Sequence, residues 1–128
     1  MSFSLSSGAS GTSGAPSPVR VIIVDDSAVI RGLISRALKE DSAIEVVGTA
    51  GNGDMAIDVL KRIPADVVIL DIEMPVMDGL TAIPRLKAID PAVQIVMAST
   101  LTQKNAEVSM KAMALGATDY IPKPSSRE

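Results

Sequence analysis

The sequence of 128 residues contains neither cysteine nor histidine. The absence of cysteine excludes a disulfide framework, a thiolate metal site and a thiol nucleophile. The absence of histidine excludes an imidazole base or ligand, so phosphate carried on a histidine has to come from a partner protein. Aromatic residues make up 2% of the chain and hydrophobic residues 47%, with seven methionines. The core is therefore expected to be aliphatic.

Basic residues are not in excess, and the formal net charge is −3. Without a basic run, direct nucleic-acid binding by this segment has little electrostatic support. No apolar stretch approaches the roughly 20 residues that cross a bilayer. The N-terminus lacks the basic and apolar regions of a secretory signal. We therefore expect a cytoplasmic protein without membrane attachment.

The chain divides by composition near Val19. Residues 1–18 are rich in Ser, Gly and Pro and contain few large apolar side chains. Such a composition cannot offset its ordering entropy by burial, which predicts a flexible tail. We expect one domain over 19–124, followed at 125–128 by the start of a linker or a truncated helix.

Short apolar runs alternate with stretches of helical spacing after Val19. The apolar runs are rich in β-branched residues, which predicts buried strands, and the stretches between them predict amphipathic helices. We expect strands at 21–24, 44–50, 67–71, 93–99 and 118–121. We expect helices after an N-cap at Ser27, between the turn 51–53 and Pro64, at about 80–89 and at 103–115.

This alternation predicts an α/β, doubly wound fold with a parallel sheet covered on both faces. The last helix carries Ala106, Met110 and Met113 on one side, and Gly116 is expected to end it. Right-handed crossovers bring the C-terminal ends of all strands to one edge of the sheet, where ligands of such folds bind.

Polar residues follow the predicted strands at that edge. Asp25 and Asp26 follow the first strand, Asp71 ends the third, Ser99 ends the fourth and Lys123 follows the fifth. Three carboxylates in close proximity repel one another, and a hard divalent cation relieves that repulsion. Mg²⁺ fits because it takes oxygen ligands and keeps water positions that phosphate oxygens can occupy.

These residues match the needs of phosphoryl transfer. Asp71 is the expected nucleophile, while the metal, the Ser99 hydroxyl and the Lys123 ammonium stabilise the phosphoryl oxygens. Taken singly, each residue has a plainer interpretation as a cap, a turn residue or a surface charge. Their joint placement at successive strand ends favours the functional interpretation.

The segment Gly51-Asn52-Gly53-Asp54-Met55-Ala56 fits the dinucleotide-binding pattern G-x-G-x-x-A. However, it follows the second predicted strand, and the next strand-ending acid, Asp71, is already assigned to another role. We therefore interpret the segment as a tight turn between a strand and a helix.

Four motifs resemble the receiver domain of two-component response regulators, over about residues 19–124. They are Val24-Asp25-Asp26-Ser27, the run from Leu70 to Gly79 (LDIEMPVMDG), Ser99, and Tyr120-Ile121-Pro122-Lys123-Pro124. The resemblance implies a five-stranded flavodoxin-like sheet of order 2-1-3-4-5.

The resemblance also implies the roles of individual residues. Asp71 is the implied phosphoryl acceptor, with a histidine kinase or a small acyl phosphate as donor. Asp26 is the implied direct Mg²⁺ ligand, Asp25 a ligand through water, and Glu73 a ligand through its backbone carbonyl. The domain would thus catalyse only its own phosphorylation and dephosphorylation.

The resemblance further implies a switch. Ser99 moves toward the phosphoryl group, Tyr120 turns inward, and the surface of the fourth helix and fifth strand changes to control an output domain or effector. An amphipathic ring half-buried at a sheet edge explains Tyr120 equally well.

Within the receiver family, three segments resemble the regulatory domain of the chemotaxis protein-glutamate methylesterase: 44–50, 70–75 and 99–102. The esterase itself is not expected here, because the sequence contains no G-x-S-x-G motif and no histidine.

Two features depart from the receiver pattern. The final receiver helix cannot be formed by residues 125–128 alone, so we expect it to be missing. We therefore expect Ile30, Leu33 and Ile34 to be under-covered, which favours a homodimer or cover by the tail. Pro84 lies within the third helix and is expected to kink it or delay its start.

Two alternative functions remain open. A stand-alone receiver would signal by docking onto a partner protein and would keep the same chemistry. A Mg²⁺-dependent phosphohydrolase with an aspartyl nucleophile typically carries a second aspartate two residues later, where this chain has Glu73. The sequence therefore favours the receiver.

Overall fold

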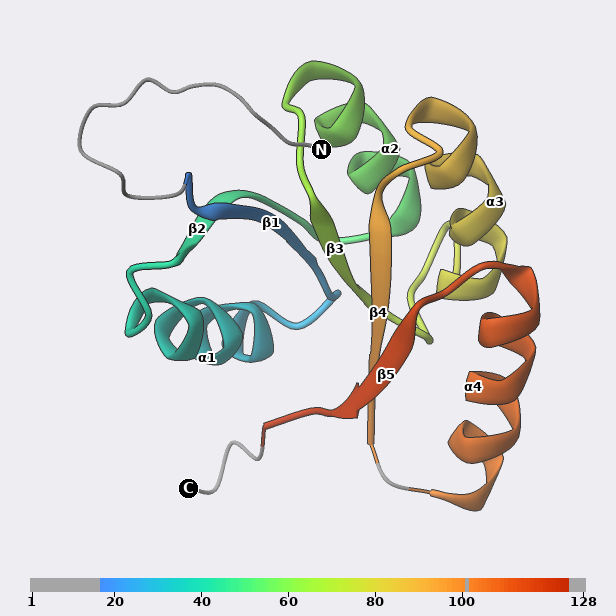
Figure 1. The fold of residues 1–128 in the computed structure, drawn as a ribbon. Helices are drawn as coiled ribbons and strands as arrows, with labels where there is room; N and C mark the ends of the chain where they lie inside the picture. The colour runs from blue at the N-terminus through green and yellow to red at the C-terminus, as the bar shows by residue number, and fades with distance from the viewer. Residues whose placement is uncertain (1–16, 101, 125–128) are drawn as a thin grey trace.

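The computed structural model describes residues 17–100 and 102–124. They form an α/β fold of alternating strands and helices (Figure 1). The predicted linker at 125–128 and nearly all of the predicted tail lie outside these residues. The strands are β1 (Val19–Val24), β2 (Ile44–Ala50), β3 (Val67–Asp71), β4 (Gln94–Ser99) and β5 (Asp119–Pro122). The helices are α1 (Ala28–Lys39), α2 (Gly53–Arg62), α3 (Gly79–Ile89) and α4 (Gln103–Leu115).

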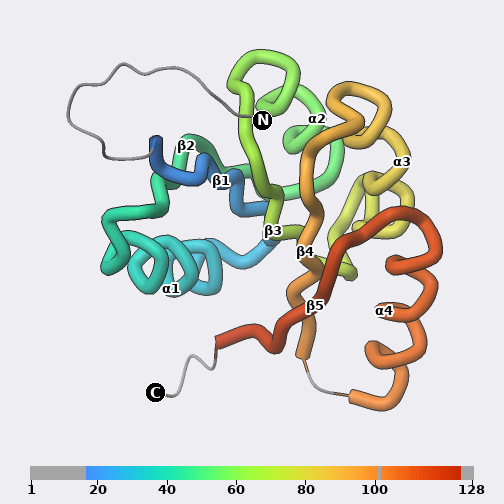
Figure 2. Tube along the Cα trace, viewed as in Figure 1, coloured from blue at the N-terminus to red at the C-terminus, as the bar shows by residue number. Residues whose placement is uncertain are grey.

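The five strands form one parallel sheet of order β2-β1-β3-β4-β5, as predicted. The Cα trace shows α1 on one side of the sheet and α2, α3 and α4 together on the other (Figure 2). Within the described residues, no helix follows β5. None of the described helices is both long and apolar enough to cross a membrane.

Side chains cap the helices where they begin. The Ser27 hydroxyl accepts a hydrogen bond from the amide of Ile30, which confirms the predicted N-cap of α1. Asn52, Asp78 and Thr102 do the same for α2, α3 and α4. At the other end of α4, Gly116 adopts the left-handed conformation with φ of 118°. That conformation is cheapest for glycine, which explains the end of the helix.

The glycine motif at 51–56 spans the short turn after β2 and the first residues of α2. A Cβ atom on Gly53 would lie 2.9 Å from the carbonyl oxygen of Met77, and the Gly53 amide donates a hydrogen bond to that oxygen at 3.2 Å. The space beside the turn is therefore filled by the loop after β3. This contact agrees with our interpretation of the motif as a tight turn.

The core lies on both faces of the central strands. The largest completely buried side chains are aliphatic, as the composition predicts, and include Ile22, Ile23, Leu70, Ile83, Leu86 and Ile95. On the α1 face, Ile34 is only 6% exposed, whereas Ile30 and Leu33 are half-buried. The prediction that this helix face is under-covered is therefore wrong for Ile34, and the described contacts give no support to a dimer through it.

One prediction about α4 and part of one about α3 are wrong. Ala106, Met110 and Met113 of α4 are exposed, whereas the buried residues of this helix are Asn105, Ser109 and Ala112. The sequence predicts that the more hydrophobic side of this helix faces the protein. Instead the small side chains face inward, because they can pack closely where methionine cannot. Of the two effects expected of Pro84, a delayed start of α3 is wrong, because the helix begins at Gly79 and contains Pro84. The kink stays a prediction.

Candidate functional site

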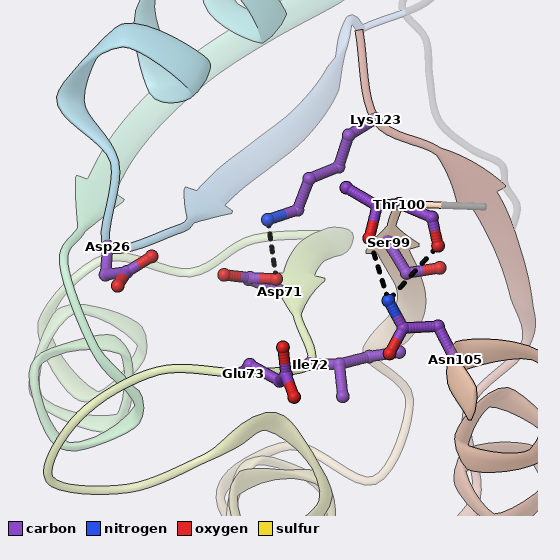
Figure 3. A pocket seen from close by; sticks show the side chains of 8 residues that line it. All are labelled: Asp26, Asp71, Ile72, Glu73, Ser99, Thr100, Asn105 and Lys123. Atoms are coloured by element: carbon purple, nitrogen blue, oxygen red, sulfur yellow. Dashed lines mark hydrogen bonds and ion pairs between the residues drawn. The ribbon is translucent and has the colours of Figure 1, made fainter. Parts of the chain in front are cut away.

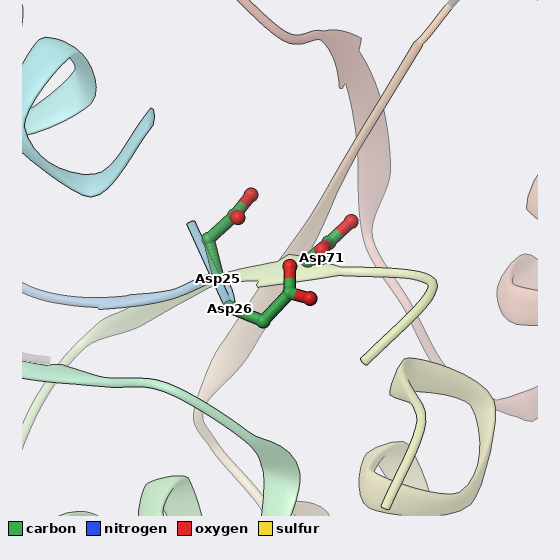
Figure 4. Close-up of side chains that lie close together, drawn as sticks. All are labelled: Asp25, Asp26 and Asp71. Atoms are coloured by element: carbon green, nitrogen blue, oxygen red, sulfur yellow. The ribbon is translucent and has the colours of Figure 1, made fainter. Parts of the chain in front are cut away.

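Three aspartates meet at the C-terminal edge of the sheet. Asp25 and Asp26 directly follow β1, and Asp71 is the last residue of β3 (Figure 4). One carboxylate oxygen from each lies within 4.8 Å of the others. Asp25 and Asp71 are 1% and 3% exposed, whereas Asp26 is exposed to solvent. The structure therefore brings together the acidic cluster that the strand ends predict.

The loop after β1 holds Asp25 in place. A carboxylate oxygen of Asp25 accepts a hydrogen bond from the amide of Ser27 at 2.8 Å. The backbone carbonyl of Asp25 accepts one from the Arg31 guanidinium at 2.6 Å, and its amide donates to Ala50 at 3.1 Å. Sequence analysis did not identify the role of Arg31, because nothing in its spacing along α1 distinguishes it from a surface cation.

Lys123 joins the two buried acids. Its Nζ atom lies 2.8 Å from Oδ1 of Asp71 and 3.0 Å from Oδ2 of Asp25. The Lys123 amide donates to the carbonyl oxygen of Ser99 at 2.9 Å, which extends the pairing of β4 and β5 to this residue. The pairing of β4 and β5 thus positions the Lys123 ammonium beside Asp25 and Asp71.

The buried cluster shifts the acid–base properties of both partners. Burial raises the pKa of Asp71 to about 6; the Lys123 hydrogen bond opposes this rise, and the nearby charge of Asp25 adds to it. Burial also lowers the pKa of Lys123, but hydrogen bonds to Asp71 and Asp25 outweigh it and hold that pKa above its ordinary value. Lys123 therefore remains charged at neutral pH.

A cavity of about 310 Å³ opens above Asp71 (Figure 3). Ser99, 5% exposed, forms part of its wall, whereas Tyr120 is 45% exposed and does not line it. The Glu73 side chain lies at the rim, 3.3 Å from the ammonium of Lys104. Thr100 and Asn105 also line the cavity, and sequence analysis missed both. The lining residues are Asp26, Asp71, Ile72, Glu73, Ser99, Thr100, Asn105 and Lys123.

The donor atoms of this cavity fit a hard cation. Oδ2 of Asp71 is buried and has no hydrogen-bond partner within residues 17–100 and 102–124, although Oδ1 of the same carboxylate is paired with Lys123. An unpaired buried carboxylate oxygen is costly, and a cation bound by oxygen ligands would satisfy it. Because the cluster offers only oxygen atoms, magnesium fits better than a metal that prefers nitrogen or sulfur.

The sheet order, together with an acidic cluster, a hydroxyl and a lysine at its C-terminal edge, defines the receiver class of α/β proteins. The chain belongs to that family, because the family model for the response regulator receiver domain matches residues 21–128.

The curated relatives carry this domain within longer proteins. A protein-glutamate methylesterase/protein-glutamine glutaminase from Rhodospirillum centenum is 62% identical over 117 residues, which cover 91% of this chain and 30% of that protein. A relative of the same name from Azospirillum brasilense is 62% identical over 109 residues, covering 85% of this chain and 28% of that protein. The chain thus spans under a third of the length of these two relatives.

Solved receiver structures have the same fold. The response regulator domain of Thermotoga maritima CheB is 34% identical, with a TM-score of 0.77 over 84% of this chain and 79% of that one. A chain of the complex between the P1 domain of CheA3 and CheY6 from R. sphaeroides is 38% identical, with a TM-score of 0.75 over 87% of this chain and 86% of that one.

Proposed function

We propose that Asp71 accepts a phosphoryl group from a phosphohistidine on a partner histidine kinase. The observation that carries this proposal is the asymmetry of the Asp71 carboxylate. Its Oδ1 is paired with Lys123 at 2.8 Å, whereas its Oδ2 has no hydrogen-bond partner in the part of the chain that the structure describes. The residue lines the cavity. The two oxygens of the acceptor carboxylate thus differ, since one is paired with the Lys123 ammonium and the other, within the described chain, is unpaired beside the cavity.

The transfer is a displacement at phosphorus. A lone pair on the Asp71 carboxylate forms the new O–P bond as the bond from phosphorus to the donor breaks. The donor, an imidazole or an acetate, leaves with the electron pair of that bond. Lys123 and the Ser99 hydroxyl are placed to bind the phosphoryl oxygens by charge and hydrogen bonding.

Asp26, Asp71, Asp25 through water, and the backbone carbonyl of Glu73 would hold Mg²⁺. When bound, the ion neutralises the negative charge that the phosphoryl oxygens and the carboxylates bring together. The closeness of the three carboxylates, within 4.8 Å, supports this set of ligands. Asp26 is the exposed member of the set and is therefore the most accessible to an ion from solvent.

The proposed output is a change on the surface of α4 and β5. Ser99 moves toward the phosphoryl group, and Tyr120 turns from its exposed position toward the space thus opened. Exposed Met110 and Met113 on α4 and Ile121 on β5 give this surface apolar contacts for a partner. The relatives named above suggest that a methylesterase domain is the regulated partner.

A stand-alone receiver that docks onto a separate protein is the alternative output. For either output we propose a histidine kinase as the principal donor and the cytoplasm as the location. The solved complex of a CheA3 P1 domain with CheY6 supports a kinase domain of that kind as donor. Apart from its own phosphorylation and dephosphorylation, this chain has no proposed catalytic activity.

The test is incubation with Mg²⁺ and acetyl phosphate, followed by intact-protein mass spectrometry. We expect about one phosphoryl group per chain, stable in acid and labile in base, and no labelling after removal of the metal by EDTA. Asp71→Asn should abolish labelling. The variant Asp58→Asn, which changes an exposed aspartate of α2, should be labelled like the parent. Undiminished labelling of Asp71→Asn contradicts the proposal, and repeated turnover of a phosphomonoester favours a phosphohydrolase.

A further inference from the structure

The first turn of α4 contributes Asn105 to the wall of the cavity. This side chain is 8% exposed and lies near Asp71 and Ser99 (Figure 3). Its amide Nδ2 donates hydrogen bonds to the carbonyl oxygen of Thr100 at 3.1 Å and to the Thr100 hydroxyl at 2.9 Å. Both hydrogen bonds thus end on the residue that directly follows Ser99.

Further hydrogen bonds join this segment to α4 and β5. The Thr102 amide donates to the carbonyl oxygen of Thr100 at 3.0 Å, and the Asn105 amide donates to the Thr102 hydroxyl at 3.1 Å. The carbonyl oxygen of Ser99 accepts from the amide of Lys123 at 2.9 Å. The backbone at Ser99 and Thr100 is therefore hydrogen-bonded both to β5 and to the start of α4.

The rest of the inner side of α4 gives that helix little specific anchorage. Ala112 is completely buried but small, and half-buried Val108 adds apolar contact with the core. Ser109 is 1% exposed, and its hydroxyl has no hydrogen-bond partner among the described residues. On the outer side, Lys104 reaches Glu73 at 3.3 Å, but both side chains are largely exposed and such pairs contribute little. The two hydrogen bonds from the Asn105 side chain to Thr100 thus form a buried polar contact between α4 and the cavity wall. We call this pair of hydrogen bonds the Asn105 tie.

We propose that Asn105 is a positioning residue that holds Thr100, and through it Ser99, in the resting arrangement. This inference rests on the proposed function, in which Ser99 moves toward a phosphoryl group on Asp71. Because Thr100 is bonded covalently to Ser99, that movement strains or breaks the two hydrogen bonds from Asn105. Asn105 therefore opposes phosphorylation until the phosphoryl contacts compensate for the lost bonds.

Loss of the Asn105 tie should favour the arrangement in which Ser99 lies close to the phosphoryl group on Asp71. We expect Asn105→Ala to raise the initial rate of labelling by acetyl phosphate about three- to tenfold, the range expected for losing one or two such hydrogen bonds. Thr100→Val, which removes only the hydroxyl acceptor, should raise the rate by a smaller factor. Asn52→Ala is the matched control, since it removes an asparagine cap that lies outside the cavity.

The experiment combines two measurements on the parent and these variants. Amide hydrogen exchange, followed by NMR on the unphosphorylated proteins, reports whether the tie exists. In Asn105→Ala we expect faster exchange of the Thr102 and Ala106 amides, which bond to Thr100 and Thr102. Asn52→Ala should leave both amides unchanged. The second measurement is the initial rate of labelling with Mg²⁺ and acetyl phosphate.

The outcomes separate this inference from the proposed function. Faster exchange with faster labelling in Asn105→Ala alone supports the tie. Unchanged exchange at Thr102 and Ala106 overturns it, as does a labelling rate equal to that of Asn52→Ala. A slower rate also overturns it, because Asn105 would then assist the phosphoryl group directly. Absence of labelling in the parent contradicts the proposed function, and exchange alone then decides whether the tie exists.

Discussion

Lys123 and Asp71 form an ion pair of 2.8 Å at the buried edge of the sheet, and the same ammonium lies 3.0 Å from Asp25. One cation therefore compensates two buried carboxylates. A divalent ion bound at the cluster would also neutralise these carboxylates. The stability of the folded protein should therefore depend on metal binding.

We expect Lys123→Ala to lower the free energy of unfolding by about 2 to 3 kcal/mol without Mg²⁺, since it leaves two buried acids without their cation. Saturating Mg²⁺ should restore part of this loss. Urea unfolding at pH 7, with and without the metal, measures both effects. As a control, Lys111→Ala replaces an exposed lysine of α4 and should change the free energy of unfolding by less than about 0.5 kcal/mol. Equal effects of the two substitutions would contradict the role given to Lys123.

Asp71→Asn should stabilise the metal-free protein at pH 7 by about 2 kcal/mol. The pKa of Asp71 is about 6 in the folded protein and 3.8 ordinarily, so folding favours the protonated carboxyl. The stabilising contribution of that proton is complete below about pH 4 and is lost as pH rises through about 6.

The difference between the parent and Asp71→Asn should therefore shrink as pH falls from 7 to 4. Thermal or urea unfolding in EDTA at several pH values measures it. Asp58→Asn provides the control, because that aspartate is exposed on α2. A difference between parent and Asp71→Asn that stays constant over this range would show that the pKa of Asp71 is not raised.

Val76 adopts a positive φ of 72° and is 82% exposed. A β-branched residue is strained in that conformation, while glycine adopts it freely. We expect Val76→Gly to raise the free energy of unfolding by about 1 kcal/mol, measured by urea unfolding. The same substitution at exposed Val29 in α1 should lower stability by a few tenths of a kcal/mol or more, because glycine disfavours helix. Destabilisation at both positions would argue against strain at Val76.

Ser109→Ala should raise the free energy of unfolding by about 1 kcal/mol. The hydroxyl of Ser109 is buried and finds no hydrogen-bond partner in the described chain, so its removal abolishes a desolvation penalty. Ser35→Ala in α1 controls for the higher helix propensity of alanine, because Ser35 is half-buried. Urea unfolding should show the larger gain at Ser109. An equal gain at both positions would assign the effect to propensity alone.

The strands of the sheet could be predicted because each one shows its apolar, β-branched pattern within its own few residues, independently of contacts with distant residues. The run at 67–71 is apolar until it ends at Asp71, and the run at 44–50 is mostly apolar and ends at the turn 51–53. The structure places β3 and β2 within the same bounds. The acidic cluster was predicted for the same reason, since parallel strands bring their carboxyl ends to one edge.

Other features depend on contacts between elements that sequence spacing does not reveal. The inner side of α4 was misassigned because Met110 and Met113 are more hydrophobic than Asn105 and Ser109, although the smaller residues pack inward. The bond from Arg31 to the carbonyl oxygen of Asp25 exists only when α1 packs beside the end of β1. The Asn105 contacts likewise require the loop after β4 to fold against α4.

The identity of the acceptor is the central claim, and localisation of the phosphoryl group tests it most directly. Borohydride reduces an acyl phosphate, which converts a phosphorylated aspartate to homoserine. After treatment with Mg²⁺ and acetyl phosphate, reduction and proteolysis, tandem mass spectrometry should find homoserine at position 71 and aspartate at positions 25 and 26. Homoserine at either of those two positions, with aspartate retained at position 71, would contradict the account.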